Sequence, residues 1–240
     1  MINTHTEIIV AVRGWSHPSW NGSFYPDDLP EDWQLSYYGN EFNAVVVPAS
    51  GWVGLDYVEV ERWVEDVPEK FLFYLEVEDN STDWEQTADF IKPLSSRLGG
   101  ILLRPAEVDT GLDGISANIA AASRLATVSL LLPEGIEPDT AGKSLLKEYG
   151  IQCGWNVGVG EPGWMGEEFD SQLVVVRVPG NKNFTARQWR ETIDASLPKG
   201  DIKDGTLLLM LECEDPKITD LRTAMMIGEM MSVPASLLQK

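Results

Sequence analysis

The segment from Ile8 to Pro26 reads IIVAVRGWSHPSWNGSFYP and contains the strongest local signals in the chain. Its first five residues are apolar and lie between Glu7 and Arg13, which predicts a short buried β-strand at positions 8–13. A loop rich in aromatic residues, glycine and proline follows at once, beginning with Gly14. A buried strand that leads directly into such a loop is the expected beginning of a β/α unit.

Seven further segments predict strands in the rest of the chain. They lie at positions 44–49, 71–77, 100–104, 127–132, 151–159, 173–178 and 206–212. Several are almost continuous runs of Val, Ile and Leu, which is typical of parallel strands buried on both faces. Helical patterns separate most of them. Thr82 with Glu85, and Thr185 with Gln188, form capping boxes that mark the starts of two such helices.

Eight strands alternating with helices predict one α/β domain over residues 1–240, a TIM-type (β/α)8 barrel. The connection between the sixth and seventh strands, positions 160–171, is short and rich in glycine, so we expect its helix to be missing or vestigial. An open, doubly wound sheet is the alternative. Because no G-x-x-x-x-G-K-[ST] occurs in the chain, a phosphate-binding-loop version of that sheet is disfavoured.

The composition restricts the partners. The 38 acidic and 18 basic residues give a net charge of −20, which repels nucleic acid and anionic membranes, although the same acidity also keeps a surface hydrated. Cys153 and Cys213 lie in apolar runs and are expected to be buried reduced thiols. With no signal-peptide pattern and no long apolar stretch, we expect a cytoplasmic protein without a membrane segment.

The first loop also carries a resemblance to a known family. It reads Gly14-Trp15-Ser16-x-Pro18-x-Trp20-x-Gly22-x-Phe24-Tyr25-Pro26, followed by Leu29-Pro30, Trp33 and Tyr37-Tyr38. This pattern resembles the YecE-like family, a domain of unknown function (number 72). Weaker similarity continues through Phe42-Asn43, Trp63 to Phe73, Leu98-Gly99 and Val176-Arg177-x-x-Gly180. The resemblance implies a TIM-type barrel with no established activity.

The chain departs from that family at the mouth of the barrel. The resemblance implies a Glu and an Asn on strand two, a Lys on strand three, a Glu-x-Arg on strand five and a His after strand seven. The residues found there are Val46, Pro48, Glu76, Leu130 to Leu132 and Pro179, and of the family's set Arg177 is retained. The departures indicate either a rebuilt site or the loss of the ancestral one.

Polar and aromatic side chains near the carboxyl ends of the predicted strands define the candidate site, because ligands of such barrels bind there. The predicted ligand-binding residues are Arg13, Trp15, His17, Arg104, Trp155 and Arg177. Arginines bind carboxylate or phosphate groups through two hydrogen bonds, and Glu76 or Glu212 is the candidate for proton transfer. The leading hypothesis is therefore a barrel that binds a small phosphorylated or carboxylated ligand, with or without catalysis. Ordinary ion pairs at strand ends explain the same residues.

Two other classes of function remain open. The missing polar set favours a catalytically degenerate barrel that acts as a binding or scaffold protein. A barrel related to metal-dependent endonucleases needs histidine ligands, and the chain has only His5 and His17. We therefore expect no metal site and no cofactor. For Trp20, Phe24 and Tyr25 we expect packing within the first loop, whereas Trp15 is expected to line a pocket.

Overall fold

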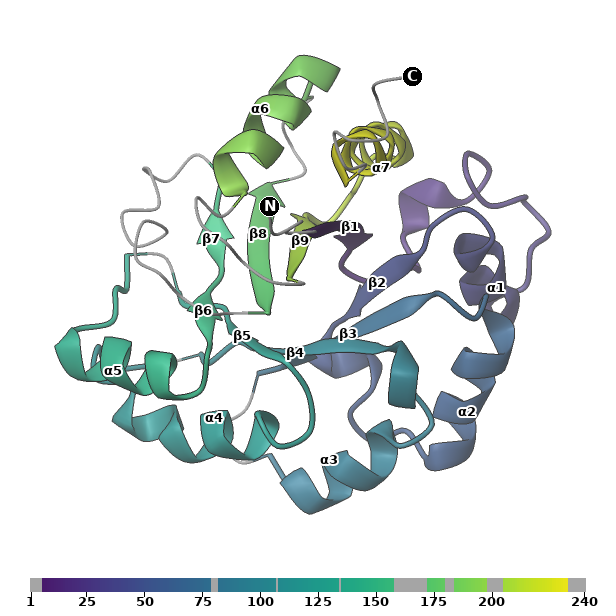
Figure 1. The fold of residues 1–240 in the computed structure, drawn as a ribbon. Coiled ribbons are helices and arrows are strands. Elements are labelled where there is room, and N and C mark those ends of the chain that lie inside the picture. The colour runs from purple at the N-terminus through teal and green to yellow at the C-terminus, as the bar shows by residue number, and fades with distance from the viewer. Residues whose placement is uncertain are drawn as a thin grey trace.

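The computed structural model describes residues 6–78, 82–106, 108–133, 135–157, 172–179, 184–197 and 205–232. Its strands are β1 Glu7–Val12, β2 Ala44–Val47, β3 Leu72–Val77, β4 Leu98–Leu103, β5 Val128–Leu130, β6 Gln152–Cys153, β7 Trp155–Asn156, β8 Leu173–Pro179 and β9 Thr206–Glu212. Its α-helices are α1 Gln34–Gly39, α2 Tyr57–Asp66, α3 Trp84–Ile91, α4 Ser116–Ala122, α5 Thr140–Glu148, α6 Ala186–Ser196 and α7 Ile218–Ser232. The helices lie around the outside of the strands (Figure 1).

The strands form two parallel sheets, in the orders β1-β9-β8-β7 and β2-β3-β4-β5-β6. On one side the chain passes from one sheet into the other, because only Gly154 separates β6 from β7. On the other side, a single bridge between Arg13 and Val46 joins β1 to β2. The predicted TIM-type α/β fold is confirmed, but the ring of strand hydrogen bonds is not fully closed.

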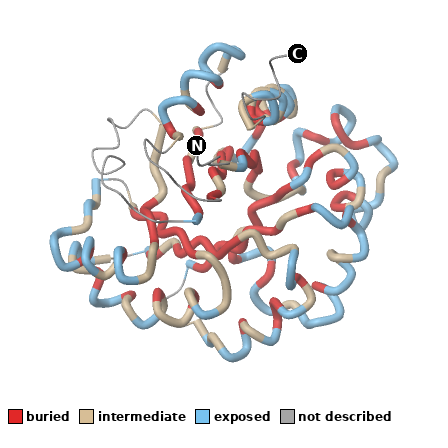
Figure 2. The backbone as a smooth tube through the Cα atoms, viewed as in Figure 1, coloured by how far each residue is buried: buried red, intermediate tan, exposed pale blue. Residues whose placement is uncertain are grey.

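Alternation along the strands divides their side chains between two environments. One set packs inside the ring, and it includes Ile9 and Ala11 on β1, Tyr74 on β3, Leu102 on β4 and Val175 on β8. The intervening residues pack outward under the helices. Buried residues therefore concentrate in the strands at the centre of the molecule (Figure 2). This double burial explains the nearly continuous apolar runs in the sequence.

Both predicted capping boxes fall at helix starts, but one differs in detail. Thr185 and Gln188 form the predicted box at α6. At α3 the cap is Asp83, whose carboxylate accepts hydrogen bonds from the backbone of Glu85 and Gln86. Aspartate is as good a cap as threonine, so the helix begins one residue later than the Thr82 pattern indicates.

Three other predictions have different outcomes. The connection at 160–171, where a helix was expected to be missing or vestigial, lies outside the described residues, and the single-domain assignment stays a prediction. Cys153 is buried, and burial raises the pKa of its thiol to about 12, whereas Cys213 is half-buried just after β9. Among the described helices, none is long and apolar enough to cross a membrane.

Candidate functional site

Five charged side chains occupy the carboxyl ends of the strands. They are Arg13 after β1, Glu76 on β3, Arg104 after β4, Arg177 on β8 and Glu212 on β9. Each lies two residues after a side chain that packs inside the ring: Ala11, Tyr74, Leu102, Val175 and Met210. Since alternate residues of a strand share a face, the five side chains form the last inward-facing layer of the barrel. We call these five residues the mouth cluster.

Ion pairs join the mouth cluster into one chain of alternating charge. Glu76 bonds to two arginines, with Oε2 2.7 Å from Arg13 Nε and Oε1 2.8 Å from Arg104 Nη2. Glu212 does the same, with Oε1 2.8 Å from Arg104 Nη1 and Oε2 2.6 Å from Arg177 Nε. The three guanidinium groups therefore converge around two carboxylates, although they come from strands far apart in the sequence.

The mouth cluster is buried at its centre and exposed at its rim. The side chain of Glu76 is 0% exposed, whereas that of Arg13 is 34% exposed. Arg13 Nη2 also bonds to Glu78 Oε1 at 3.0 Å, and the side chain of Glu78 is 46% exposed. Three arginines and two glutamates give the cluster a charge of +1, which Glu78 balances. With Glu78 in place, the mouth is therefore formally neutral inside a strongly acidic protein, and it becomes positive when Glu78 turns away from Arg13.

The ion pairs also shift the pKa values of two members of the mouth cluster, Glu212 and Arg104. Burial by itself would raise the pKa of Glu212, but the hydrogen bond from Arg177 and the charge of Arg104 outweigh it, and the pKa is lowered. For Arg104, burial opposes the charged form, yet Glu76 and Glu212 raise its pKa. Both groups are therefore ionised at neutral pH, and Glu212 is not a proton donor there.

The other predicted site residues lie elsewhere. His17 is buried, with Nε2 3.2 Å from the carbonyl oxygen of Gly14 and its ring 4.4 Å from that of Trp20. Burial lowers the pKa of His17. The ring of Trp15 meets the ring of Trp63 edge-on at 5.3 Å, against α2. The structure thus places both residues in packing contacts next to the mouth cluster, not among its ion pairs.

Trp155 also lies outside the mouth cluster. On β7 it is in register with Val176, and its neighbour Asn156 is in register with Arg177. Paired residues of parallel strands face the same way, so Asn156 faces the mouth and Trp155 faces outward. Asn156 and Glu78 are polar residues next to the mouth cluster, and a search for arginines at strand ends does not find them. Their spacing from inward-facing residues is the signal that identifies them.

The first loop is packed by its aromatic residues. Trp20, Phe24 and Tyr25 are buried, as expected for a packing role. The ring of Trp20 stacks on that of Tyr38 at 6.0 Å, and its Nε1 donates a 2.6 Å hydrogen bond to the carbonyl oxygen of Pro216, after β9. This hydrogen bond attaches the loop to the segment that follows β9.

No group of three or more His, Cys, Asp or Glu side chains that could hold a metal ion occurs among the described residues.

The family model "Protein of unknown function DUF72" matches residues 9–178. This chain belongs to the DUF72 family. The match covers well over half of the sequence and confirms the resemblance carried by the first loop. Among curated proteins, no sequence matches this one.

Solved structures of DUF72 proteins share the fold. A DUF72 protein from Thermotoga maritima is 14% identical, with 95% of this chain and 100% of the other covered and a TM-score of 0.66. One from Enterococcus faecalis is 13% identical, with 92% and 95% covered and a TM-score of 0.65. The 3-keto-D-glucoside 4-epimerase of E. coli is 13% identical, with 93% and 99% covered and a TM-score of 0.51. At these identities the likeness shows the fold alone.

Proposed function

We propose that this DUF72 protein binds a small anionic ligand, phosphorylated or carboxylated, at the mouth of the barrel. The observation that carries the proposal is the convergence of Arg13, Arg104 and Arg177 around two shared carboxylates. Ligands of this fold bind at the carboxyl ends of the strands, where these groups lie. Once Glu78 is displaced from Arg13, the formal charge of +1 on the mouth cluster favours an anion despite the charge of −20 on the whole chain.

Arg13 is the entry point for the ligand. Its side chain is the most exposed of the three, and Nη2 bonds to the exposed carboxylate of Glu78. An incoming carboxylate or phosphate exchanges with the Glu78 side chain at Arg13. Glu76 and Glu212 hold the guanidinium groups in fixed directions, which lowers the cost of ordering them on binding.

Calorimetric titration with inorganic phosphate and with succinate, at low ionic strength, tests this proposal. Because a charged hydrogen-bonded contact contributes about 1.5–3 kcal/mol, we expect Arg13→Gln to weaken binding by about tenfold or more. Glu78→Gln removes the competing carboxylate and strengthens binding. Arg222→Gln is the control, since Arg222 pairs with Glu41 on the outer surface. Equal affinities for Arg13→Gln and Arg222→Gln, or no binding of either anion by the wild type, would refute the proposal.

A catalytically degenerate barrel that serves as a binding or scaffold protein is the second candidate. The observation that favours it is the complete pairing of Glu76, both of whose oxygens bond to arginines. Such a carboxylate stabilises the barrel without contacting any ligand. Failure of a panel of phosphorylated and carboxylated metabolites to shift the unfolding temperature of the wild type supports this candidate. A shift that disappears in Arg13→Gln contradicts it.

A further inference from the structure

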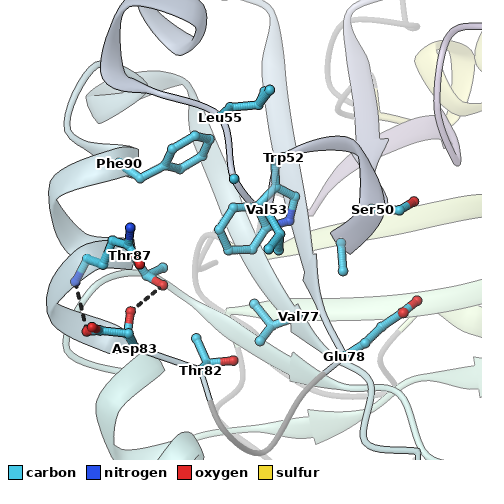
Figure 3. Close-up of a pocket in the computed structure, with 13 residues that line it drawn as sticks. Ser50, Trp52, Val53, Leu55, Val77, Glu78, Thr82, Asp83, Thr87 and Phe90 are labelled. Carbon is cyan, nitrogen blue, oxygen red and sulfur yellow. Dashed lines mark hydrogen bonds between the residues drawn. The ribbon is translucent and has the colours of Figure 1, made fainter.

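A pocket of about 550 Å³ lies beside the mouth cluster, between the turn after β2 and helix α3 (Figure 3). The turn contains Ala49–Gly51, a short 3₁₀ helix, and continues to Leu55. The pocket lies at the same end of the barrel as the mouth but outside the ring, because the outward-facing Val77 lines it. Its volume is in the range of sites for small organic molecules.

Two aromatic rings form a rigid apolar wall of the pocket. The rings of Trp52 and Phe90 lie 5.1 Å apart with their planes tilted by 33°. Figure 3 shows Phe90 on α3 beside the indole of Trp52, with Val77 nearby. The Nε1 atom of Trp52 donates a 2.8 Å hydrogen bond to the carbonyl oxygen of Glu76, which fixes the ring. A preformed wall of this kind favours an aromatic or aliphatic body.

The charged side chains in the described lining of the pocket are acidic. Glu78 and Asp83 line it, and its described lining includes no Lys, Arg or His. The two backbone hydrogen bonds that Asp83 accepts at the start of α3 both use Oδ1. The second carboxylate oxygen of Asp83 is therefore not used in capping the helix. Carboxylates on the rim of a pocket that has an aromatic wall favour a ligand that carries a positive charge on an apolar body.

We propose that this pocket binds a small organic cation, an amine attached to an aromatic or aliphatic body. The apolar body packs against Trp52 and Phe90, and the ammonium group lies at the carboxylates of the rim. The proposal does not rest on anion binding at the mouth, although the two sites share Glu78, whose carboxylate lines the pocket and pairs with Arg13. It names a second site on the same end of the barrel.

A matched series of probes tests the charge selection. Phenethylamine, 2-phenylethanol and 3-phenylpropanoate share a phenyl ring and differ in the charge of the attached group. We expect phenethylamine to bind most tightly and 3-phenylpropanoate most weakly in calorimetric titrations. The indole N–H signal of Trp52 in NMR spectra is expected to shift with phenethylamine. If the alcohol or the carboxylate binds as tightly as the amine, the charge assignment is wrong.

Asp83→Asn tests the carboxylate without removing the helix cap, since asparagine caps as well as aspartate. We expect it to weaken phenethylamine about twofold to fivefold, as for an exposed ion pair, and to leave the alcohol unchanged. Asp139→Asn is the matched control, because Asp139 caps α5 in the same way through the backbone of Ala141 and Gly142. Equal effects of the two variants on phenethylamine overturn the role of Asp83.

Gln86→Trp tests the location. Gln86 lines the pocket from the exposed side of α3, so an indole there fills the cavity without entering the core. We expect this variant to abolish binding of phenethylamine, whereas Glu148→Trp, at the exposed end of α5, leaves it unchanged. Unchanged binding in Gln86→Trp, or no binding of phenethylamine by the wild type, overturns the proposal.

Discussion

The first loop and the mouth cluster lie at the same end of the barrel but are held by different forces. The loop is fastened by buried rings such as Trp20 and Tyr25, which contact one another and the neighbouring strand end. The mouth cluster is held by ion pairs that meet at Glu76 and Glu212. The contrast indicates that apolar packing fixes the shape of the loop, whereas ion pairs fix the positions of the charged groups at the mouth.

The largest effect is expected in the loop. Trp20 is 2% exposed, and Trp20→Ala removes a large ring and its hydrogen bond to Pro216. We expect it to lower the free energy of unfolding by about 3–5 kcal/mol, measured by urea denaturation. Trp33→Ala is the control, because Trp33 is 63% exposed and should change stability by less than about 0.5 kcal/mol. Similar losses in both variants would mean that the loop does not depend on its buried rings.

A smaller loss is expected at the centre of the mouth cluster. Glu76→Gln leaves Arg13 and Arg104 without their shared negative charge. Removing one partner of a buried ion pair costs about 3–5 kcal/mol, and here the partial exposure of the arginines reduces the loss to about 2–3 kcal/mol. Denaturation of Glu78→Gln provides the comparison, with an expected change below about 1 kcal/mol for a pair at the rim. If Glu78→Gln is the more harmful change, the centre of the cluster has been misidentified.

The stability that ion pairs give the mouth cluster, unlike the stability that apolar packing gives the loop, is expected to depend on acidic pH. The pKa of Glu212 is lower in the folded protein than its ordinary value of 4.5, so its stabilising effect is complete above that value. This contribution is lost as the pH falls through the lowered pKa. We therefore expect Glu212→Gln to be less stable than the wild type at pH 7 and the difference to shrink in acid. Unfolding curves from pH 7 to pH 3 measure this.

Glu191→Gln is the control for that measurement. Glu191 pairs with Arg187 on the exposed face of α6, so little pH-dependent difference from the wild type is expected. A difference for Glu212→Gln that stays constant with pH would show that its ion pairs do not set its protonation.

The smallest effect is expected for His17 in the first loop. Burial lowers its pKa from 6.5, so the folded protein keeps the ring neutral where the unfolded chain protonates it. Stability from this residue is present above pH 6.5 and is lost as the pH falls through the lowered pKa. The wild type is therefore expected to lose a small part of its free energy of unfolding as the pH falls below 6.5, and His17→Gln is expected to abolish this loss. His5→Gln serves as the control, and equal pH profiles for the two variants would contradict the assignment.

Much of the site followed from the sequence because strand alternation is local. The strand at 206–212 is found at the expected positions, and arginines that interrupt apolar runs led to Arg13, Arg104 and Arg177. The sequence did not show that Glu76 and Glu212 each join two arginines, since pairing depends on which strand ends meet. The sequence also pointed to Trp15 and His17 as ligand-binding residues, but in the structure they lie in packing contacts outside the ion pairs. Proximity to a strand end does not reveal which way a side chain points.

The sequence by itself determined the alternation of strands and helices, the double burial of the strands and the family. These features depend on neighbours in the chain and on the period of the apolar residues. Only the tertiary structure decided the break at Gly154, the order of the ion pairs and the pocket at Trp52. Each of these depends on how segments far apart in the sequence meet. The point at Gly154 joins two sheets, the ion pairs join five strand ends, and the pocket lies between a turn and a helix.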